Sequence, residues 1–396
     1  MNGRDLNVVA AAVGLSALGD FLALIPLALH LEDTTGSGFV VALLFVAIWS
    51  PAFFLAGIAG LLVDRFDTQR VLIAVSLVQA LVALVLAFVG GTALVLVLAA
   101  LLGAGFSLAQ PAEFALVPAV APPDRLAQAN GRVETARYLG FTLGPLAGGI
   151  LAAAGGMRLA LLVNAVSFLV VALAATLVRP RAAAAELTGI DLGRARDGVV
   201  FMLREPTLAL VISIAFVSLL FMTATAPAEV FFAKDYLEIG DAGYGLLIAA
   251  WTTGMALGAV LVAPRIAATA LATGALVAIV VQGAGVGSPA LWLVPAFAFG
   301  AYFVGGVAHG TKNVLVRTLI HERVPERLHG RAFAAYAGVR NGAELVAILG
   351  GGVLIAVIGA RWTLLAAGAI PVAAALCGLA VAWRRLAPVP QGTTVA

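Results

Sequence analysis

The chain consists mainly of apolar stretches that are each long enough to cross a lipid bilayer. A helix needs roughly 20 mostly apolar residues to cross about 30 Å of hydrocarbon. Backbone groups in lipid must hydrogen-bond internally, so each stretch is expected to be helical. Of the 396 residues, 62% are hydrophobic and 11% are charged, whereas roughly a quarter of a soluble domain is charged. We therefore expect an all-α integral membrane protein.

We count twelve such stretches, and the apolar segment rich in small residues at 267–286 decides between twelve helices and one or two fewer. The predicted spans are Leu6–Leu29, Gly38–Val63, Val71–Val89, Ala93–Ala119, Leu126–Ala153, Leu159–Val178, Leu208–Phe231, Gly243–Val262, Ala267–Val286, Leu291–Leu319, Arg331–Val357 and Trp362–Trp383.

The basic residues concentrate in the loops on one side of this predicted bundle. The opposite loops carry only Arg158, Lys234 and Arg361. Because loops rich in arginine and lysine stay in the cytoplasm, both termini are expected to be cytoplasmic. The same distribution explains the excess of arginine as a signal for membrane topology, so we expect no nucleic-acid partner.

The sequence divides into two similar halves. We predict an N-terminal six-helix bundle over residues 1–180, a linker over 181–205, a C-terminal bundle over 206–386 and a cytoplasmic tail over 387–396. The linker either forms an amphipathic helix on the membrane surface over 191–203 or is unstructured. Pro123-Asp124-Arg125-Leu126 before Arg137 is echoed by Pro325-Glu326-Arg327-Leu328 before Arg340. Such a repeat predicts two pseudo-symmetric bundles with a site between them.

Two motifs point to conformational machinery. Residues 60–70, GLLVDRFDTQR, resemble the major facilitator loop motif G-x-x-x-D-R-x-x-x-x-R between the second and third spans. Here Gly60 allows a tight turn, and Asp64 can meet a helix N-terminus beside Arg65 and Arg70. Residues 140–149, GFTLGPLAGG, resemble the exporter-associated motif of the superfamily. Small residues such as Gly144 permit close helix contact, and Pro145 bends the helix.

With these motifs, the whole chain resembles the drug-exporting branch of the superfamily that is typified by macrolide and enterobactin exporters. This resemblance implies a drug:proton antiporter of the bacterial inner membrane that works by alternating access and most often as a monomer. One feature departs from the pattern. Many drug antiporters carry an arginine in the fourth span, where this chain has Glu113 and no basic residue. The patterns around Asp20 and Glu113 also resemble the lysophospholipid flippase of the same superfamily.

An ionisable residue inside a span is costly and is therefore a functional candidate. The resemblance implies that the first, fourth, seventh and tenth spans line a central cavity, and each carries one such residue, namely Asp20, Glu113, Glu229 or Lys312. We expect the three acids to couple transport to protons, with Asp20 as the main carrier. Glu113 and Lys312 are expected to pair across the cavity floor. Each also has a structural alternative, for example a hydrogen bond between helices at Asp20.

Further residues complete the predicted site. Substrate contacts are expected from Trp251, Asn341 and Met222 in addition to the four ionisable residues. A gating network is expected at the cytoplasmic ends of the fifth and eleventh spans, where spacings of three and four place the charges on one helix face. Its members are Glu134, Arg137, Arg340 and Glu344 together with Asp64.

The sequence argues against other classes of function. It has no Walker loop and no His-Glu-x-x-His pattern, and its single cysteine and four histidines show no ligand spacing. We therefore expect no catalytic residue, metal or cofactor, and a proton gradient as the energy source. The leading hypothesis is efflux of amphipathic, often cationic, drugs. Lipid flipping and export of a siderophore or metabolite are alternatives within the fold, whereas an intramembrane enzyme and a non-transporting receptor are alternatives outside it.

Overall fold

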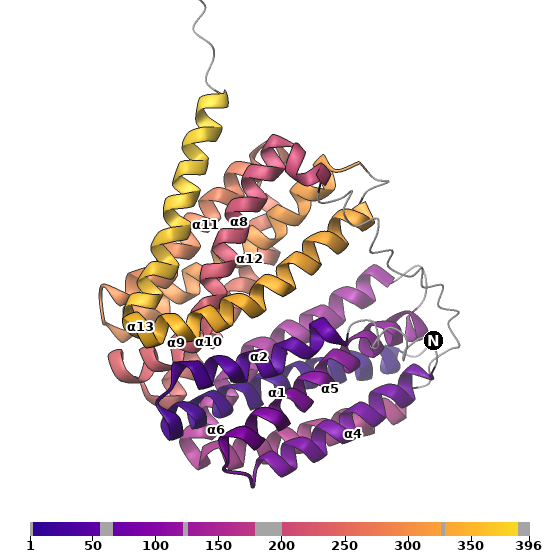
Figure 1. Ribbon diagram of the computed structural model, residues 1–396. Coiled ribbons are helices and arrows are strands. Elements are labelled where there is room, and N and C mark those ends of the chain that lie inside the picture. Colours follow the sequence, from indigo (N-terminus) through magenta and orange to yellow (C-terminus); the bar gives the residue numbers. More distant parts are fainter. Residues whose placement is uncertain (1–2, 56–65, 122–125, 179–199, 326–328, 387–396) are drawn as a thin grey trace, which may run out of the picture.

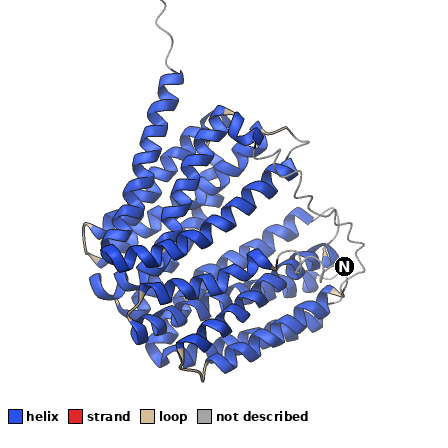
Figure 2. Cartoon of the chain, viewed as in Figure 1, coloured by secondary structure: helices blue, strands red, loops and turns tan. Residues whose placement is uncertain are grey.

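The computed structural model describes residues 3–55, 66–121, 126–178, 200–325 and 329–386. Every regular element in these ranges is helical (Figure 2). The helices form two groups, the indigo-to-pink first half and the red-to-yellow second half in Figure 1.

The first half contains six spans. They are provided by α1 (Gly3–Thr35), α2 (Gly38–Phe54), α4 (Thr68–Leu86), α5 (Thr92–Val120) and α6 (Leu126–Leu177). The long α6 holds the fifth and sixth spans, which meet at Gly155 and Gly156. Gly156 has a φ of 65°, a left-handed conformation that residues with a side chain rarely adopt. The sequence begins α4 sharply, because the Asp67 carboxylate accepts a hydrogen bond from the Arg70 N–H at 2.9 Å.

The second half also contains six spans. The seventh span is α8 (Pro206–Ala224) continued by α9 (Ala226–Phe231), and the short π-helical turn η2 (Phe232–Tyr236) follows it. The eighth to tenth are α10 (Gly240–Leu257) with η3 (Gly258–Val262), α11 (Leu271–Gly287) and α12 (Pro295–Arg323). The last two spans share α13 (His329–Leu386) and meet at Gly359, where φ is 79°. The described helices thus confirm the twelve-span prediction, including the small-residue span at α11.

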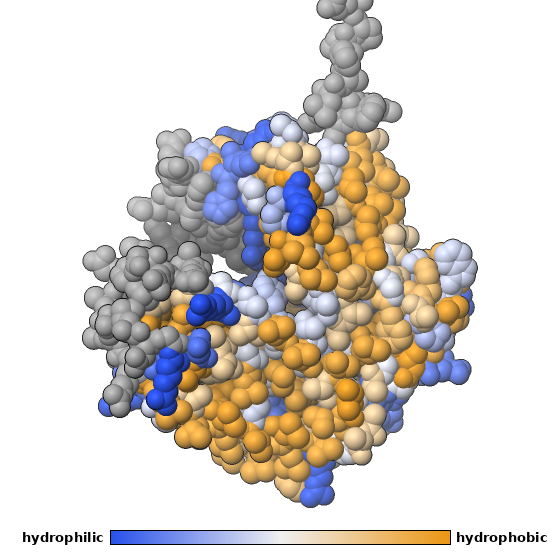
Figure 3. All heavy atoms as spheres, turned by 180° about the vertical axis from the view of Figure 1, so that it is seen from behind, coloured by the Kyte–Doolittle hydropathy of each residue, from blue (hydrophilic) through white to orange (hydrophobic). Residues whose placement is uncertain are grey.

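Large apolar side chains cover the outside of the bundle, as Figure 3 shows for one face. Among the most exposed are Leu81, Leu173, Val260, Val346 and Val357. A soluble monomer rarely exposes so extensive an apolar surface, and lipid is its natural solvent. Polar side chains are instead buried between helices. α12 in particular buries Thr311 and Lys312, between the half-buried His309 and Asn313.

The two halves touch closely at one end of the bundle. An added Cβ atom at Gly149 of α6 would lie 2.7 Å from the carbonyl oxygen of Asp241 in α10, and one at Gly38 of α2 would lie 2.7 Å from Ile355 in α13. Lys234 adds ion pairs to the first half, with Glu32 at 2.6 Å and with Asp33. We call this the closed end. Toward the other end, where α1 begins and α6 ends, the two groups of helices diverge in Figure 1.

The motif at 140–149 builds contacts both within and between the halves. An added Cβ at Gly144 would lie 2.8 Å from the carbonyl oxygen of Leu18, so this residue lets α6 pack tightly on α1. Gly149, one and a half turns further along, meets α10 of the other half. The small residues therefore do permit close helix contact, as the sequence predicts.

Several predicted gating residues fall outside this description. Gly60, Asp64 and Arg65 belong to 56–65, which lies outside the described residues, and so does most of the linker. Within the linker, only residues 200–205 are described, of which 200–204 are helical. The loop motif and the amphipathic linker helix therefore remain predictions.

Candidate functional site

A cavity of about 1140 Å³ lies between the two halves. Its walls run from Glu229 and Tyr244 near the closed end to Met202, Leu203 and Arg317 on the diverging side. A volume of this size accommodates a drug-sized molecule. Figure 3 shows the molecule hollowed between the halves.

The first half contributes a neutral, aromatic wall. Phe21 of α1, Trp49 of α2 and Phe106 of α5 line the cavity, and Trp49 contacts the other two rings. The ring centroids of Phe21 and Trp49 are 6.4 Å apart, and those of Trp49 and Phe106 are 5.9 Å apart in an edge-on arrangement. Gln110 adds one amide to this side. Such a wall offers a large apolar contact area with few rotatable bonds.

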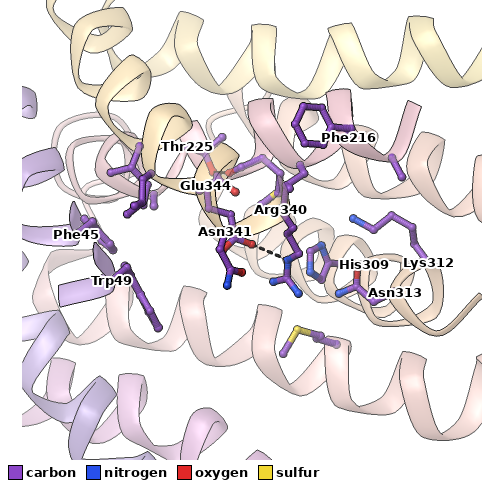
Figure 4. A pocket seen from close by; sticks show the side chains of 18 of the residues that line it. Phe45, Trp49, Phe216, Thr225, His309, Lys312, Asn313, Arg340, Asn341 and Glu344 are labelled. Carbon is purple, nitrogen blue, oxygen red and sulfur yellow. Dashed lines mark hydrogen bonds and ion pairs between the residues drawn. The ribbon is translucent and has the colours of Figure 1, made fainter. Parts of the chain in front are cut away.

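The second half contributes every charged side chain among the described residues that line the cavity. Figure 4 shows His309, Lys312 and Arg340 gathered on one side of it. Trp251, Met222 and Asn341 also line it, as the sequence predicts. The charged set is Glu229, Lys312, Arg317, Arg340 and Glu344.

Glu229 lies in the first turn of α9, directly after the seventh span is interrupted at Thr225. It is 8% exposed, and its Oε1 atom lies 3.0 Å from Thr225 Oγ1 and accepts a second hydrogen bond from the Tyr302 hydroxyl at 3.5 Å. Both partners are neutral. A carboxylate held by neutral hydroxyl groups can accept and release a proton without breaking an ion pair, which suits the predicted coupling role.

Lys312 is only 3% exposed and faces the cavity from α12. The charged groups that interact with it electrostatically are Arg340 and Glu344 of α13. The Arg340 Nε atom, however, donates a hydrogen bond to Glu344 Oε1 at 2.8 Å. This i,i+4 pair confirms the predicted shared helix face of Arg340 and Glu344.

Asp20 lies behind the aromatic wall rather than in the main cavity. It lines a separate pocket of about 30 Å³, roughly the volume of one water molecule. Phe21, Trp49 and Phe106 line both spaces, and the fully buried Asn164 borders the small one. The structure thus separates Asp20 from the cavity by a single layer of rings.

Glu113 differs most from the sequence-based expectation. It is 3% exposed, forms an ion pair with Arg137 of α6 at 3.4 Å, and shares a hydrogen bond with Ser16 of α1. Lys312 lines the cavity, whereas Glu113 does not. The expected pair between Glu113 and Lys312 is therefore not formed here, because an arginine within the first half reaches the carboxylate instead. Arg137 also pairs with Glu134 at 3.5 Å, as their spacing predicts.

The predicted gate is consequently two separate clusters in this structure. One is Glu113, Glu134 and Arg137, packed among α1, α5 and α6, and the other is Lys312, Arg340 and Glu344 at the cavity wall. Of the loop motif, the described Arg70 is exposed at the start of α4. Sequence reasoning missed Phe21, Trp49, Phe106, Tyr244 and Arg317. Only Arg317 carried a usable signal, since it follows Lys312 closely on the same helix.

Comparisons with known proteins agree with this architecture. Residues 9–343 match the Major Facilitator Superfamily. The chain is 25% identical over 392 residues to YfiS of Bacillus subtilis, an uncharacterized MFS-type transporter, covering 93% of this chain and 91% of that protein.

Solved structures are similar in fold. A mutant form of the nucleoside transporter NupG superposes with a TM-score of 0.76 at 12% identity, covering 95% of this chain and 99% of NupG. A bacterial homologue of the human lysosomal transporter Spinster, inward-facing and unoccupied, gives 0.73 at 15% identity, covering 98% and 100%.

Proposed function

The chain belongs to the major facilitator superfamily, and we propose that it is a secondary active exporter of amphipathic small molecules that is driven by the proton gradient. That it is a multi-pass membrane transporter follows from the family and from the described helices, eight of which are long and apolar enough to cross a membrane. The observation that carries the finer proposal is the cavity itself. It lies between the two halves, combines an aromatic wall with ionisable residues, and is sealed at one end by contacts between the halves.

Transport would proceed by rocking of one half against the other. We propose that the diverging end faces the cytoplasm, because the described Arg4 lies at the start of α1 there and the loops that the sequence places on that side are rich in arginine. The structure would then represent the state that takes up substrate from the cytoplasm, in a bacterial inner membrane. Opening the closed end requires the glycine contacts at Gly149 and Gly38 and the ion pairs of Lys234 to separate.

Proton coupling is assigned to Asp20, Glu113 and Glu229. Glu229 borders the cavity, so a substrate can compete directly with its proton. Asp20 acts from behind the aromatic wall and interacts electrostatically with Glu113 and Arg137. A change of charge at Asp20 would therefore act on both the rings of the wall and the cluster around Arg137. No cofactor takes part in this scheme, and a monomer is sufficient for it.

The test is transport by the purified protein in liposomes with an imposed pH gradient, using a panel of fluorescent amphipaths. We expect gradient-driven movement by the wild type, and no response to the gradient in Asp20→Asn or Glu229→Gln. The conservative control is Glu229→Asp, which keeps an acid at the cavity. Wild-type rates in both amide variants across pH would remove the coupling assignment.

Lipid flipping is the second candidate, favoured by one observation. Lys312 places a buried cation at the cavity wall, where the phosphate of a lipid headgroup could bind. Drug or multidrug efflux and lipid flipping would therefore use the same cavity. They differ in whether the substrate enters it from solution or from the lipid bilayer.

A further inference from the structure

We propose that the cavity binds organic anions, with Lys312 as the main contact for the anionic group and the aromatic wall of the first half holding the apolar part. This inference names the substrate class of the transport site and so rests on the proposed function. It differs from the cationic drugs that the sequence alone favours. A carboxylate, sulfonate or phosphate group on an apolar body would fit.

The strongest observation is that the Lys312 amine is buried without an anionic partner among the residues that the structure describes. Its residue is 3% exposed, and none of the described residues forms an ion pair or hydrogen bond with its amine. Glu344 is the described acid that interacts with Lys312 electrostatically, and it already accepts a hydrogen bond from Arg340. A buried charge is costly unless it is paired. A ligand that carries the missing negative charge would therefore gain the full benefit of this site.

The pseudo-symmetry of the chain shows what is missing. In the first half, Arg137 of α6 meets Glu113 of α5 at 3.4 Å. In the second half, Arg340 corresponds to Arg137, but Lys312 stands at the position related to Glu113. The second half thus replaces an acid with a base beside an arginine. The anionic group of a ligand would supply the negative charge that Glu113 supplies in the first half.

The other cavity groups agree with an anion. The shielded Nδ1 atom of His309 has no hydrogen-bond partner among the described residues, and the ring lies 5.4 Å from Trp251. An imidazole nitrogen can donate to an anionic oxygen. Three cations line the cavity, Lys312, Arg317 and Arg340, against two acids, Glu229 and Glu344. Glu229 accepts hydrogen bonds from Thr225 and Tyr302, and among the described residues no ion pair joins it to Lys312.

The opposite wall explains why the anion should be amphipathic. Phe21, Trp49 and Phe106 form a continuous ring surface with no charged group among the described residues on their side of the cavity. A ligand that spans the cavity would place its charge against α12 and its apolar body against α1, α2 and α5. A cation of the same shape would meet Lys312 and Arg340 and be repelled.

Three probes with one apolar body test the proposal, namely pyrenebutanoate, pyrenebutanol and pyrenebutyltrimethylammonium. Binding to the full-length protein in detergent is followed by energy transfer from tryptophan to pyrene. We expect the anion to bind the wild type most tightly. Lys312→Met should weaken the anion by about tenfold or more, the effect of losing a charge-assisted hydrogen bond, and leave the alcohol unchanged. Lys312→Arg should restore anion binding.

The controls separate this inference from the proposed function. Arg158→Gln removes a cation that stacks on Phe88 away from the cavity, and it should leave all three affinities unchanged. Equal losses for anion and alcohol in Lys312→Met, or tighter binding of the cation by the wild type, would overturn the proposal. Binding is measured without a gradient. Lys312-dependent anion binding without gradient-driven movement in liposomes would therefore support the anion site and contradict the exporter.

A second arm identifies the source of the anion. Fluorescent lysophosphatidylglycerol in the liposome membrane is compared with pyrenebutanoate supplied in solution. Transport of either that falls in Lys312→Met but not in Arg158→Gln supports the anion site, and the faster substrate shows whether the group comes from a lipid headgroup or from a free amphipath. Transport of both at the wild-type rate in Lys312→Met would contradict it.

Discussion

The two halves of this transporter bury charge in opposite ways. In the first half, Glu113 and Arg137 pair with each other, and their side chains are 4% and 6% exposed. In the second half, the related cluster of Lys312, Arg340 and Glu344 lies at the cavity wall, where the Arg340 and Glu344 side chains are 37% and 28% exposed.

This difference shows how a repeated architecture can divide its tasks. The first half keeps its charges away from the cavity, with Glu113 paired to Arg137, and presents aromatic rings to it, whereas the second half presents charges. Related positions in the two repeats, such as Glu113 and Lys312, therefore have unrelated roles. Substitutions that exchange the properties of the two clusters test this difference.

Removal of the arginine from each cluster should give the largest contrast. Arg137→Met leaves Glu113 buried without its cation, and breaking a buried pair costs about 3–5 kcal/mol of stability. Arg340→Met leaves Glu344 near water, and pairs of this kind contribute about 1 kcal/mol or less. Thermal unfolding of both variants in detergent measures the difference.

The contrast has an internal control. Adding Glu113→Gln to Arg137→Met removes the stranded carboxylate and should recover part of the lost stability. Equal shifts in melting temperature for the two methionine variants would mean that the two clusters contribute equally to stability, which would contradict this prediction.

A substitution that gives the second cluster the same charges as the first should have the next largest effect, which is on anion binding. Lys312→Glu places an acid beside Arg340, as Glu113 lies beside Arg137. We expect anion binding to fall by about tenfold or more and the preference between the anionic and cationic pyrene probes to reverse. Lys312→Gln is the matched control, because it removes the cation without supplying an acid. An unchanged anion preference in Lys312→Glu would place the binding site elsewhere in the cavity.

The sequence predicts the frame of this molecule well. Length and apolarity predict the twelve spans, because lipid admits few other structures. Small residues at Gly144 and Gly149 predict close helix contacts, and the spacings of Glu134 with Arg137 and of Arg340 with Glu344 predict ion pairs within a helix. These features depend on local geometry or on the solvent.

The sequence predicts the site less well, for physical reasons. Whether Glu113 faces the cavity depends on the rotation of α5 and on the reach of Arg137 from α6, and neither follows from a pattern within one span. Phe21, Trp49 and Phe106 resemble ordinary packing residues until three helices bring them together. The cationic character of the cavity emerges only when the charged residues are sorted by the wall on which they lie.

The smallest expected effect concerns the closed end, where ion pairs join the two halves. Lys234 pairs with Glu32 and Asp33 across the halves. Lys234→Ala should shift the equilibrium toward opening of this end by about 0.5–1 kcal/mol, or roughly two- to fivefold. Spin labels at Thr34 and Glu238, in a Cys377→Ser background, would report the shift as a larger population of long distances.

Two features make this last prediction specific. Arg361→Ala removes a cation whose Nε donates to the Ala290 carbonyl within the second half, so it should leave the distances unchanged. Burial lowers the pKa of Lys234, but the hydrogen bonds and charges of Asp33 and Glu32 outweigh burial and raise that pKa above its ordinary value of 10.5. The stabilising contribution of the lysine charge is therefore fully present below pH 10.5 and is lost as pH rises further. A dependence of the distances on pH between about 6 and 9 that disappears in Lys234→Ala would contradict this assignment, because Lys234 keeps its charge throughout that range.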